Sequence, residues 1–327
     1  MNLHVSVVIP TKNGGALLRR VVREVLEQET HFSFDLTLID SGSNDGVVDE
    51  LEVLKDERLK VIRVPAESFG HGRTRNEAIA ASRGKYIAML TQDALPVDKM
   101  WLANLVQTIE DDDKLAGVFG RHVAYPDADI FTKREIQSHF DGFKATVSQE
   151  PLLTETEDEY SIRYFFSDNN AIIRRSVWEK IPYPDVSYAE DQLWAKLILQ
   201  AGWKKGFSDL GAVFHSHNYS IVDLFRRSLD ESRALEKYFN YQSAPSIMKA
   251  LRNWLGTSFR DTQYFFGKRT LRGGTFGLLV NRLVGNLVKY VGLYLGGRTT
   301  IHSEGLRRLL SYDHRMKVGL RKEKQDD

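Results

Sequence analysis

The alternation of short apolar runs with helical patterns in residues 5–90 constrains the fold of this chain more than any other feature. Strands are expected at Val5–Ile9, Leu36–Ile39, Lys60–Val64 and Tyr86–Leu90. Helices are expected at Ala16–Gln28, Val48–Leu54 and Arg75–Ser82, followed by others at Met100–Glu110 and from Glu190. Because strands that alternate with helices build a mainly parallel sheet with both faces covered, we predict an α/β fold.

Polar residues follow three of these strands. Thr11 follows the first strand, Asp40 ends the second, and Asp93 follows the fourth. Ligands of open α/β sheets bind at the carboxyl ends of the strands, so these three residues should lie on one edge. Asp93 suits a divalent ion that carries a phosphate, although a strand-end turn whose Asp satisfies local amides explains it equally well.

Two loops near this edge are candidates for nucleotide contacts. Residues 9–15 form a glycine-containing loop that could receive a phosphate or a base. Asp40 could accept a base imide N–H or a ribose hydroxyl, or it could cap the turn 41–46. The chain contains neither GxGxxG nor GxxxxGK[ST], which disfavours a dinucleotide dehydrogenase and a P-loop NTPase.

Three further segments carry candidate chemistry. Arg73 and Arg75 stand at a helix start and suit a diphosphate, with surface solvation as the alternative. Glu190 and Asp191 also begin a helix, where they could supply a general base or an N-cap pair. The segment 215–217 places two His residues on one strand face, where they could bind a metal or be structural.

The C-terminal part differs in charge from the rest. Residues 246–327 carry 16 Lys and Arg against 6 Asp and Glu, which leaves 29 against 38 elsewhere. We therefore expect a first domain at 1–221 and a basic helical extension at 222–327, in contact with phosphate-rich matter. The apolar segment 276–295 is interrupted on one helix face by Asn281, Arg282, Asn286 and Lys289. Such a face favours an interfacial helix over a membrane span, with packing on its own domain or on a second copy of the chain as the alternative.

Three other observations bear on location and order. The chain has no cysteine, which excludes thiol chemistry and suits a reducing cytoplasm. A strand-like run begins at Val5, so no signal peptide is expected. Residues 126–160 show little periodicity and are expected to be irregular and partly mobile.

Six segments, taken in order, resemble the family-two inverting glycosyltransferases of the GT-A fold over residues 4–225. They are VSVVIPTKNGG, LIDSGSNDG, GHGRTRNEA, KYIAMLTQDALP, YAEDQLWAKLILQAG and FHSHNYS. TQDALP and GHGRTRNEA are most similar to segments of bacterial rhamnosyltransferases that build surface polysaccharides. The resemblance implies a GT-A domain, here followed by a C-terminal helical extension.

The resemblance also implies roles for individual residues. Those implied for the donor's base and ribose are Pro10, Thr11 and Asp40, and those near the diphosphate, or supporting that loop, are Arg73, Arg75 and Asn76. Gln92 and Asp93 occupy the place of the family's aspartate-x-aspartate motif, so this site has one carboxylate fewer than many relatives. Asp93, with His215 or His217, would bind Mg²⁺ or Mn²⁺. Asp191 would be the catalytic base, beside Glu190.

The implied reaction is transfer of L-rhamnose from dTDP-L-rhamnose to a hydroxyl of a lipid-linked glycan. The implied location is the cytoplasmic face of the cell membrane, with a homodimer as a further option and no nucleic acid as partner. No Q-x-x-R-W motif follows the acidic pair, which favours addition of one or a few sugars. The alternatives are a nucleotidyltransferase, and a non-catalytic module that binds glycans or nucleic acid through the aromatic and basic segment 254–272.

Overall fold

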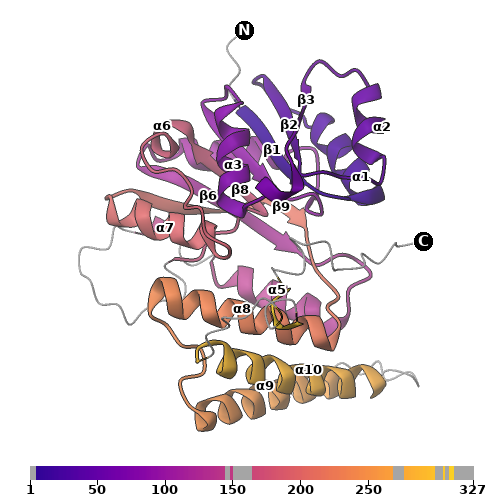
Figure 1. The fold of residues 1–327 in the computed structure, drawn as a ribbon, viewed down its shortest axis with the longest axis vertical. Helices are drawn as coiled ribbons and strands as arrows, with labels where there is room; N and C mark the ends of the chain where they lie inside the picture. Colours follow the sequence, from indigo (N-terminus) through magenta and orange to yellow (C-terminus); the bar gives the residue numbers. More distant parts are fainter. Residues whose placement is uncertain are drawn as a thin grey trace. The chain divides into compact units, whose positions relative to one another are not determined.

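The computed structural model describes residues 5–143, 148–149, 164–267, 276–298, 305 and 309–312. The described residues form two compact units that divide between Ser216 and His217 (Figure 1). We call them the first unit and the second unit.

A nine-stranded mixed sheet forms the centre of the first unit. Its first half consists of parallel strands in the order β3 (Leu59–Arg63), β2 (Phe34–Asp40), β1 (Val5–Thr11) and β4 (Tyr86–Leu90). It continues through β8 (Asn170–Arg174), β6 (Leu115–Val123), β9 (Lys204–Phe214) and β5 (Leu95–Pro96), and β7 (Ser148–Gln149) also pairs with β9. The expected mainly parallel arrangement is confirmed, with β8, β5 and β7 as the antiparallel members.

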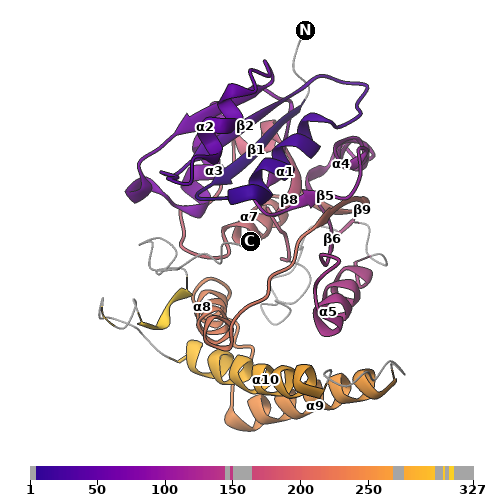
Figure 2. The same ribbon diagram turned by 90° about the vertical axis from the view of Figure 1, so that its right-hand side faces the viewer.

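Helices cover both faces of the sheet because successive strand residues point to opposite sides. Val7 packs into one core with residues of α1 (Gly15–Leu26), α2 (Val47–Val53) and α4 (Trp101–Glu110). Val8 packs into a second core with α3 (His71–Ala80), α6 (Arg175–Trp178) and α7 (Glu190–Gln200). A short 3₁₀ helix, η1 (Ala66–Ser68), precedes α3. In Figure 1 the strands β1–β3 lie between α3 on one side and α1 and α2 on the other, and Figure 2 views the sheet from the side of α1 and α2.

The direction of β8 brings distant segments to the carboxyl ends of the parallel strands. β8 runs antiparallel to β4, and Asn170 at its start pairs with Leu90 at the end of β4. The turn before β8 therefore lies at the same edge as the residues after β4. At the same edge, Leu95 of β5 pairs with Phe214 of β9, which brings the segments on either side of them together.

One segment differs from its prediction. Part of 126–160 forms the helix α5 (Ile130–Asp141), and residues 150–160 lie outside the described part. Asp129 caps α5 by accepting hydrogen bonds from the backbone N–H groups of Phe131 and Thr132. This cap satisfies donors that an isolated helix start leaves unpaired, so the helix forms despite its weak periodicity.

The second unit contains the helices α8 (Ile221–Phe239), α9 (Ile247–Gly267) and α10 (Phe276–Gly296), as the sequence predicts. α10 packs closely on α8 because glycines lie at the contact. A Cβ at Gly292 would stand 2.8 Å from the carbonyl oxygen of Phe225, so a larger residue there would force the helices apart. None of the described helices has the length and apolar character of a membrane span.

The polar face of α10 makes contacts within the second unit. Arg282 Nε and Asn286 Nδ2 donate to Asp261 Oδ2 of α9 at 2.7 and 2.8 Å. Asp261 is fully buried, so its charge requires these donors. Two of the four polar residues on that face therefore join α10 to α9, which agrees with the alternative that α10 packs on its own domain.

Candidate functional site

The loops that follow β1 and β2 are tied to each other. The backbone N–H of Asn13 donates to Ser43 Oγ, and that of Asn44 donates to Asn13 Oδ1, both at 2.8 Å. Asp40, which is buried, accepts hydrogen bonds from the backbone N–H and the hydroxyl of Ser43. The carboxylate of Asp40 therefore also serves as the local turn cap that its sequence context allowed.

Gln92 holds the loop after β1 against the end of β4. Its Oε1 accepts from the Thr11 hydroxyl and the Lys12 backbone N–H, both at 2.8 Å, and its Nε2 donates to the Lys12 carbonyl at 3.3 Å. An amide side chain both accepts and donates, whereas an ionised carboxylate only accepts. Glutamine at this position is thus explained by its contacts with the loop.

Asp93 lies beside two histidines. Asp93 Oδ1 is 3.6 Å from His215 Nε2, and a nitrogen of His217, the residue at which the second unit begins, completes a set whose potential ligand atoms lie within 4.8 Å of one another. One carboxylate and two imidazoles are the ligands expected of a transition-metal site. Mg²⁺ prefers oxygen ligands alone, so this set suits Mn²⁺ better.

Two residues that sequence reasoning did not single out border this group. The Tyr125 hydroxyl donates to the backbone carbonyl of Asp93 at 3.1 Å. Asn169 Nδ2 lies 3.5 Å from His215 Nε2. Asn169 precedes β8, and nothing in the sequence indicates that β8 runs antiparallel to β4 and so starts at this edge.

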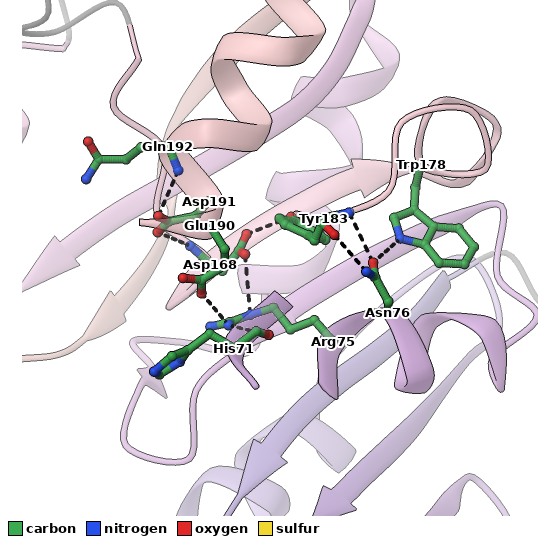
Figure 3. A network of polar contacts seen from close by, with 9 residues as sticks. All are labelled: His71, Arg75, Asn76, Asp168, Trp178, Tyr183, Glu190, Asp191 and Gln192. Carbon is green, nitrogen blue, oxygen red and sulfur yellow. Dashed lines mark hydrogen bonds and ion pairs between the residues drawn. The ribbon is translucent and has the colours of Figure 1, made fainter. Parts of the chain in front are cut away.

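A buried arginine holds two carboxylates together at the start of α7 (Figure 3). Arg75 Nη1 donates to Glu190 Oε1 at 2.5 Å, and Arg75 Nε is 3.3 Å from Asp168 Oδ2. All three side chains are at least nine-tenths buried. Asp168, another residue that sequence reasoning missed, also accepts a hydrogen bond from the Tyr183 hydroxyl at 2.8 Å. Removing one member of such a buried set leaves an uncompensated charge, so the group acts as a unit.

Asp191 lies next to this set and keeps some accessible surface. Its Oδ1 accepts from the Gln192 backbone N–H at 2.8 Å, and its Oδ2 is 3.5 Å from the Asp168 backbone nitrogen. Ala189 precedes the helix with φ of 60°, which costs a non-glycine residue energy and turns the chain sharply into α7.

The electrostatics of this cluster follow from one cation among three carboxylates. Burial raises the pKa of Asp168 to about 6, against the opposing effect of Arg75 and with a further rise from Glu190. Burial also raises the pKa of Asp191 well above its ordinary value, and the charges of Glu190 and Asp168 add to this rise. A carboxylate whose pKa is raised binds a proton more tightly, as a general base at neutral pH requires.

Arg73 and Asn76, which were also expected near the diphosphate or as supports of that loop, differ in exposure and in their partners. Arg73 is half-exposed and forms an ion pair of 3.0 Å with Asp185. Asn76 donates to the Tyr183 carbonyl and accepts from Trp178 Nε1, both at 2.8 Å, as Figure 3 shows. Asn76 thus fixes the segment that leads to α7, and Arg75 fixes the carboxylates.

The residues described above form one continuous edge. Thr11 and Asp40 are paired across β1 and β2, and Gln92 connects Thr11 to Asp93. From there the contacts pass through His215, Asn169 and Asp168 to Asp191. The group of Asp93 and His215, whose side chains suit a metal ion, and the carboxylates around Arg75 therefore lie at the same edge of the sheet.

Comparisons with known proteins agree with this arrangement. The sequence profile described as "Glycosyl transferase family 2" matches residues 6–181. The O-antigen chain rhamnosyltransferase RfbN of Salmonella typhimurium is 31% identical over 232 residues, which cover 70% of this chain and 71% of that protein. Its counterpart WbaN of Salmonella anatum is 29% identical over 231 residues, 69% of this chain and 70% of that protein.

Solved structures share the fold. The mannosyltransferase PcManGT from Pyrobaculum calidifontis, in complex with GDP-Man and Mn²⁺, is similar with a TM-score of 0.60 at 17% identity, over 91% of this chain and 87% of that one. S. aureus TarS 1-349 in complex with UDP has a TM-score of 0.51 at 17% identity, over 96% and 88%. These likenesses support a GT-A-like fold with α8–α10 as a C-terminal addition.

The raised pKa of Asp168 predicts how stability depends on pH. The folded state holds a proton on Asp168 up to about pH 6, whereas the unfolded chain loses it near pH 4. The resulting stabilisation is present at low pH and is lost as pH rises through about 6. Relative to Asp168→Asn, the wild type should therefore lose up to about 3 kcal/mol of unfolding free energy between about pH 4 and 7. Urea melts of both proteins measure this, and a wild type that gains stability over the variant with rising pH would contradict it.

Proposed function

The chain belongs to glycosyl transferase family 2, and on that premise we propose that it transfers L-rhamnose from dTDP-L-rhamnose to a hydroxyl of a surface glycan. The observation that carries the proposal is the single edge on which the Asp93 group and the Asp191 group lie. The similarity to two O-antigen rhamnosyltransferases supports the choice of sugar.

The loops after β1 and β2 would bind the nucleoside of the donor. Pro10 and Thr11 stand at the end of β1, next to Asp40. The hydrogen bonds between the two loops, and the Gln92 contacts, would hold these residues in place before the donor arrives. Such preorganisation lowers the ordering cost of binding. Arg73, exposed at the start of α3, would contact the diphosphate by exchanging its ion pair with Asp185.

Asp93, His215 and His217 would hold a divalent ion, with Mn²⁺ favoured over Mg²⁺ by the two imidazoles. The ion would supply positive charge for the leaving diphosphate. Asn169 and Tyr125 would position this group through His215 and the Asp93 carbonyl.

Asp191 would act as the general base. The acceptor oxygen attacks the anomeric carbon while its proton passes to an Asp191 oxygen. The bond from the anomeric carbon to the diphosphate oxygen breaks, the nucleoside diphosphate leaves, and the configuration inverts. Glu190 lies beside the base, and Arg75 would hold Glu190 and Asp168 so that their charges keep the pKa of Asp191 high.

The acceptor would be a lipid-linked glycan, handled at the cytoplasmic face of the cell membrane. The basic C-terminal sequence supports this location, because the inner leaflet carries anionic lipids. In this proposal, residues 1–221 perform catalysis and residues 222–327 contact the membrane or a second chain.

The proposed donor predicts which nucleotide the protein releases. A panel of dTDP-L-rhamnose, GDP-mannose and UDP-N-acetylglucosamine, incubated without acceptor, should show slow hydrolysis of the first alone, because water can replace the acceptor hydroxyl. Chromatography of the nucleotides measures this. Faster release of GDP or UDP would refute the rhamnose donor, and pyrophosphate released from dTTP and a sugar phosphate would indicate a nucleotidyltransferase.

The proposed base predicts the effect of Asp191→Asn. The amide cannot accept the hydroxyl proton, so the transfer rate should fall about 10²–10⁴-fold while donor affinity changes little. Initial rates and calorimetric titration with the donor measure the two quantities. Asp113→Asn, which removes an exposed carboxylate elsewhere in the first unit, is the matched control and should retain transfer. Transfer at the wild-type rate by Asp191→Asn would remove Asp191 from this role.

The proposed ion site predicts a dependence on divalent metal. EDTA should abolish transfer, and Mn²⁺ should restore it at lower concentration than Mg²⁺ because of the imidazole ligands. Electron paramagnetic resonance of bound Mn²⁺ gives a readout that does not require activity, and His215→Ala should weaken it. His31→Ala changes an exposed histidine elsewhere in the first unit and serves as control. Undiminished transfer after complete removal of metal would contradict this prediction.

A further inference from the structure

We propose that the second unit docks on an anionic lipid bilayer through the exposed apolar sides of α9 and α10. This inference rests on the proposed function for its biological setting. It adds to that function the surface through which the protein contacts the membrane.

Exposed apolar side chains gather on these two helices. Of the 19 large hydrophobic residues that are exposed in the described part of the chain, 12 lie on α9 and α10. Single exposed hydrophobic residues are normal on soluble proteins, whereas a contiguous patch indicates a binding surface. The second unit therefore presents a surface that needs an explanation.

The exposed residues form a stripe on each helix. On α9 the spacing of four residues from Leu251 to Leu255 and Phe259 places these side chains on one side. On α10 the same spacing relates Val280 to Val284, and Val291 continues the stripe. We call these six residues the apolar face.

Both stripes point to the same side of the helix pair. Asp261 of α9 contacts Asn286 of α10, and Thr257 contacts Tyr290, so the two helices are antiparallel. On each helix the stripe lies about a third of a turn from these contacts, in the same rotational sense. In an antiparallel pair that places both stripes on one side.

The internal polar contacts explain why the apolar residues point outward. Asp261, Arg282 and Asn286 satisfy one another between the helices, and glycines of α10 pack on α8. These polar and small residues lie inside the unit beside the buried Phe265, Leu279 and Leu293. The apolar residues of the stripes are left on the outside, where an ordinary surface helix carries mainly polar residues.

Charge identifies the partner as an anionic bilayer. Lys249 and Arg252 are exposed on α9, whereas the single acidic residue in the sequence of either helix, Asp261, is buried. Apolar residues flanked by cations suit a membrane interface that contains anionic lipid. A second copy docked on the same face would bring like charges together, with no exposed acid on α9 or α10 to pair with them.

Vesicle flotation of the full chain tests the proposal. The probes are vesicles of phosphatidylcholine alone and vesicles in which half of the lipid is phosphatidylglycerol. The wild type should float with the anionic vesicles and much less with the neutral ones. The double variant Leu255→Asp/Val284→Asp should lose more than about ten-fold in partitioning, because each change removes apolar area and adds a repelled charge.

Matched variants separate the surface from general effects. Val53→Asp/Leu210→Asp makes the same chemical change at exposed residues of the first unit and should float like the wild type. Lys249→Gln/Arg252→Gln keeps the apolar face and should lose about thirty-fold on anionic vesicles, at roughly one factor of five per cation. Circular dichroism and thermal melts confirm that each variant is folded.

Equal flotation of the wild type and of Leu255→Asp/Val284→Asp would overturn the proposal. So would light scattering that shows a dimer for the wild type and a monomer for that variant, because the face would then bind a second copy. Flotation needs neither donor nor acceptor. Failure of this inference therefore leaves the proposed transfer reaction intact, and failure of the donor panel leaves the membrane contact intact.

Discussion

The ion-pair set of Arg75 with Glu190 and Asp168 is the interaction on which the site depends. It joins three segments that are far apart in the chain: the start of α3, the turn before β8 and the start of α7. In a buried environment, loss of one partner costs about 3–5 kcal/mol, so the three segments stay together or separate together. Asp191 is positioned as a consequence, because its backbone is continuous with Glu190 and its carboxylate lies next to Asp168.

A second constraint acts at the end of β4. Gln92 bonds to the loop after β1 through both ends of its amide, whereas Asp93 next to it is associated with His215. In the proposed function, these two neighbours take the place of a pair of acidic residues. Glutamine has one negative charge fewer than glutamate and gains a donor, which fixes the loop after β1 and would leave the imidazoles to complete the proposed ion site.

The second unit illustrates how burial of polar groups directs apolar groups outward. Asp261 has no access to water and must be paired, and its partners include Arg282 and Asn286 of α10. Once those polar residues lie between the helices, the apolar stripes that lie away from these contacts remain exposed. The protein thus combines a GT-A-like unit with a helical unit whose exposed side is unlike that of an ordinary soluble domain.

Much of the fold follows from local pattern. The strands β1 to β4 and the helices between them could be predicted because each carries its own periodicity and because parallel strands need such crossovers. Residues that end those strands, such as Thr11, Asp40 and Asp93, could be assigned to one edge for the same reason. The capped helix α5 was missed because a single Asp cap is a weaker signal than periodicity.

The sequence by itself determined the alternating architecture, the family resemblance and the candidate acidic residues Asp40, Asp93, Glu190 and Asp191. Only the tertiary structure decided what each charged group contacts. Arg75 was expected near a diphosphate or as a support of that loop, and it lies between two carboxylates. Asp168 became part of the site because β8 runs antiparallel to β4, and Arg282 contacts Asp261 inside the second unit. Periodicity is a property of neighbours along the chain, whereas the cost of burying a charge depends on partners that only the folded chain brings near.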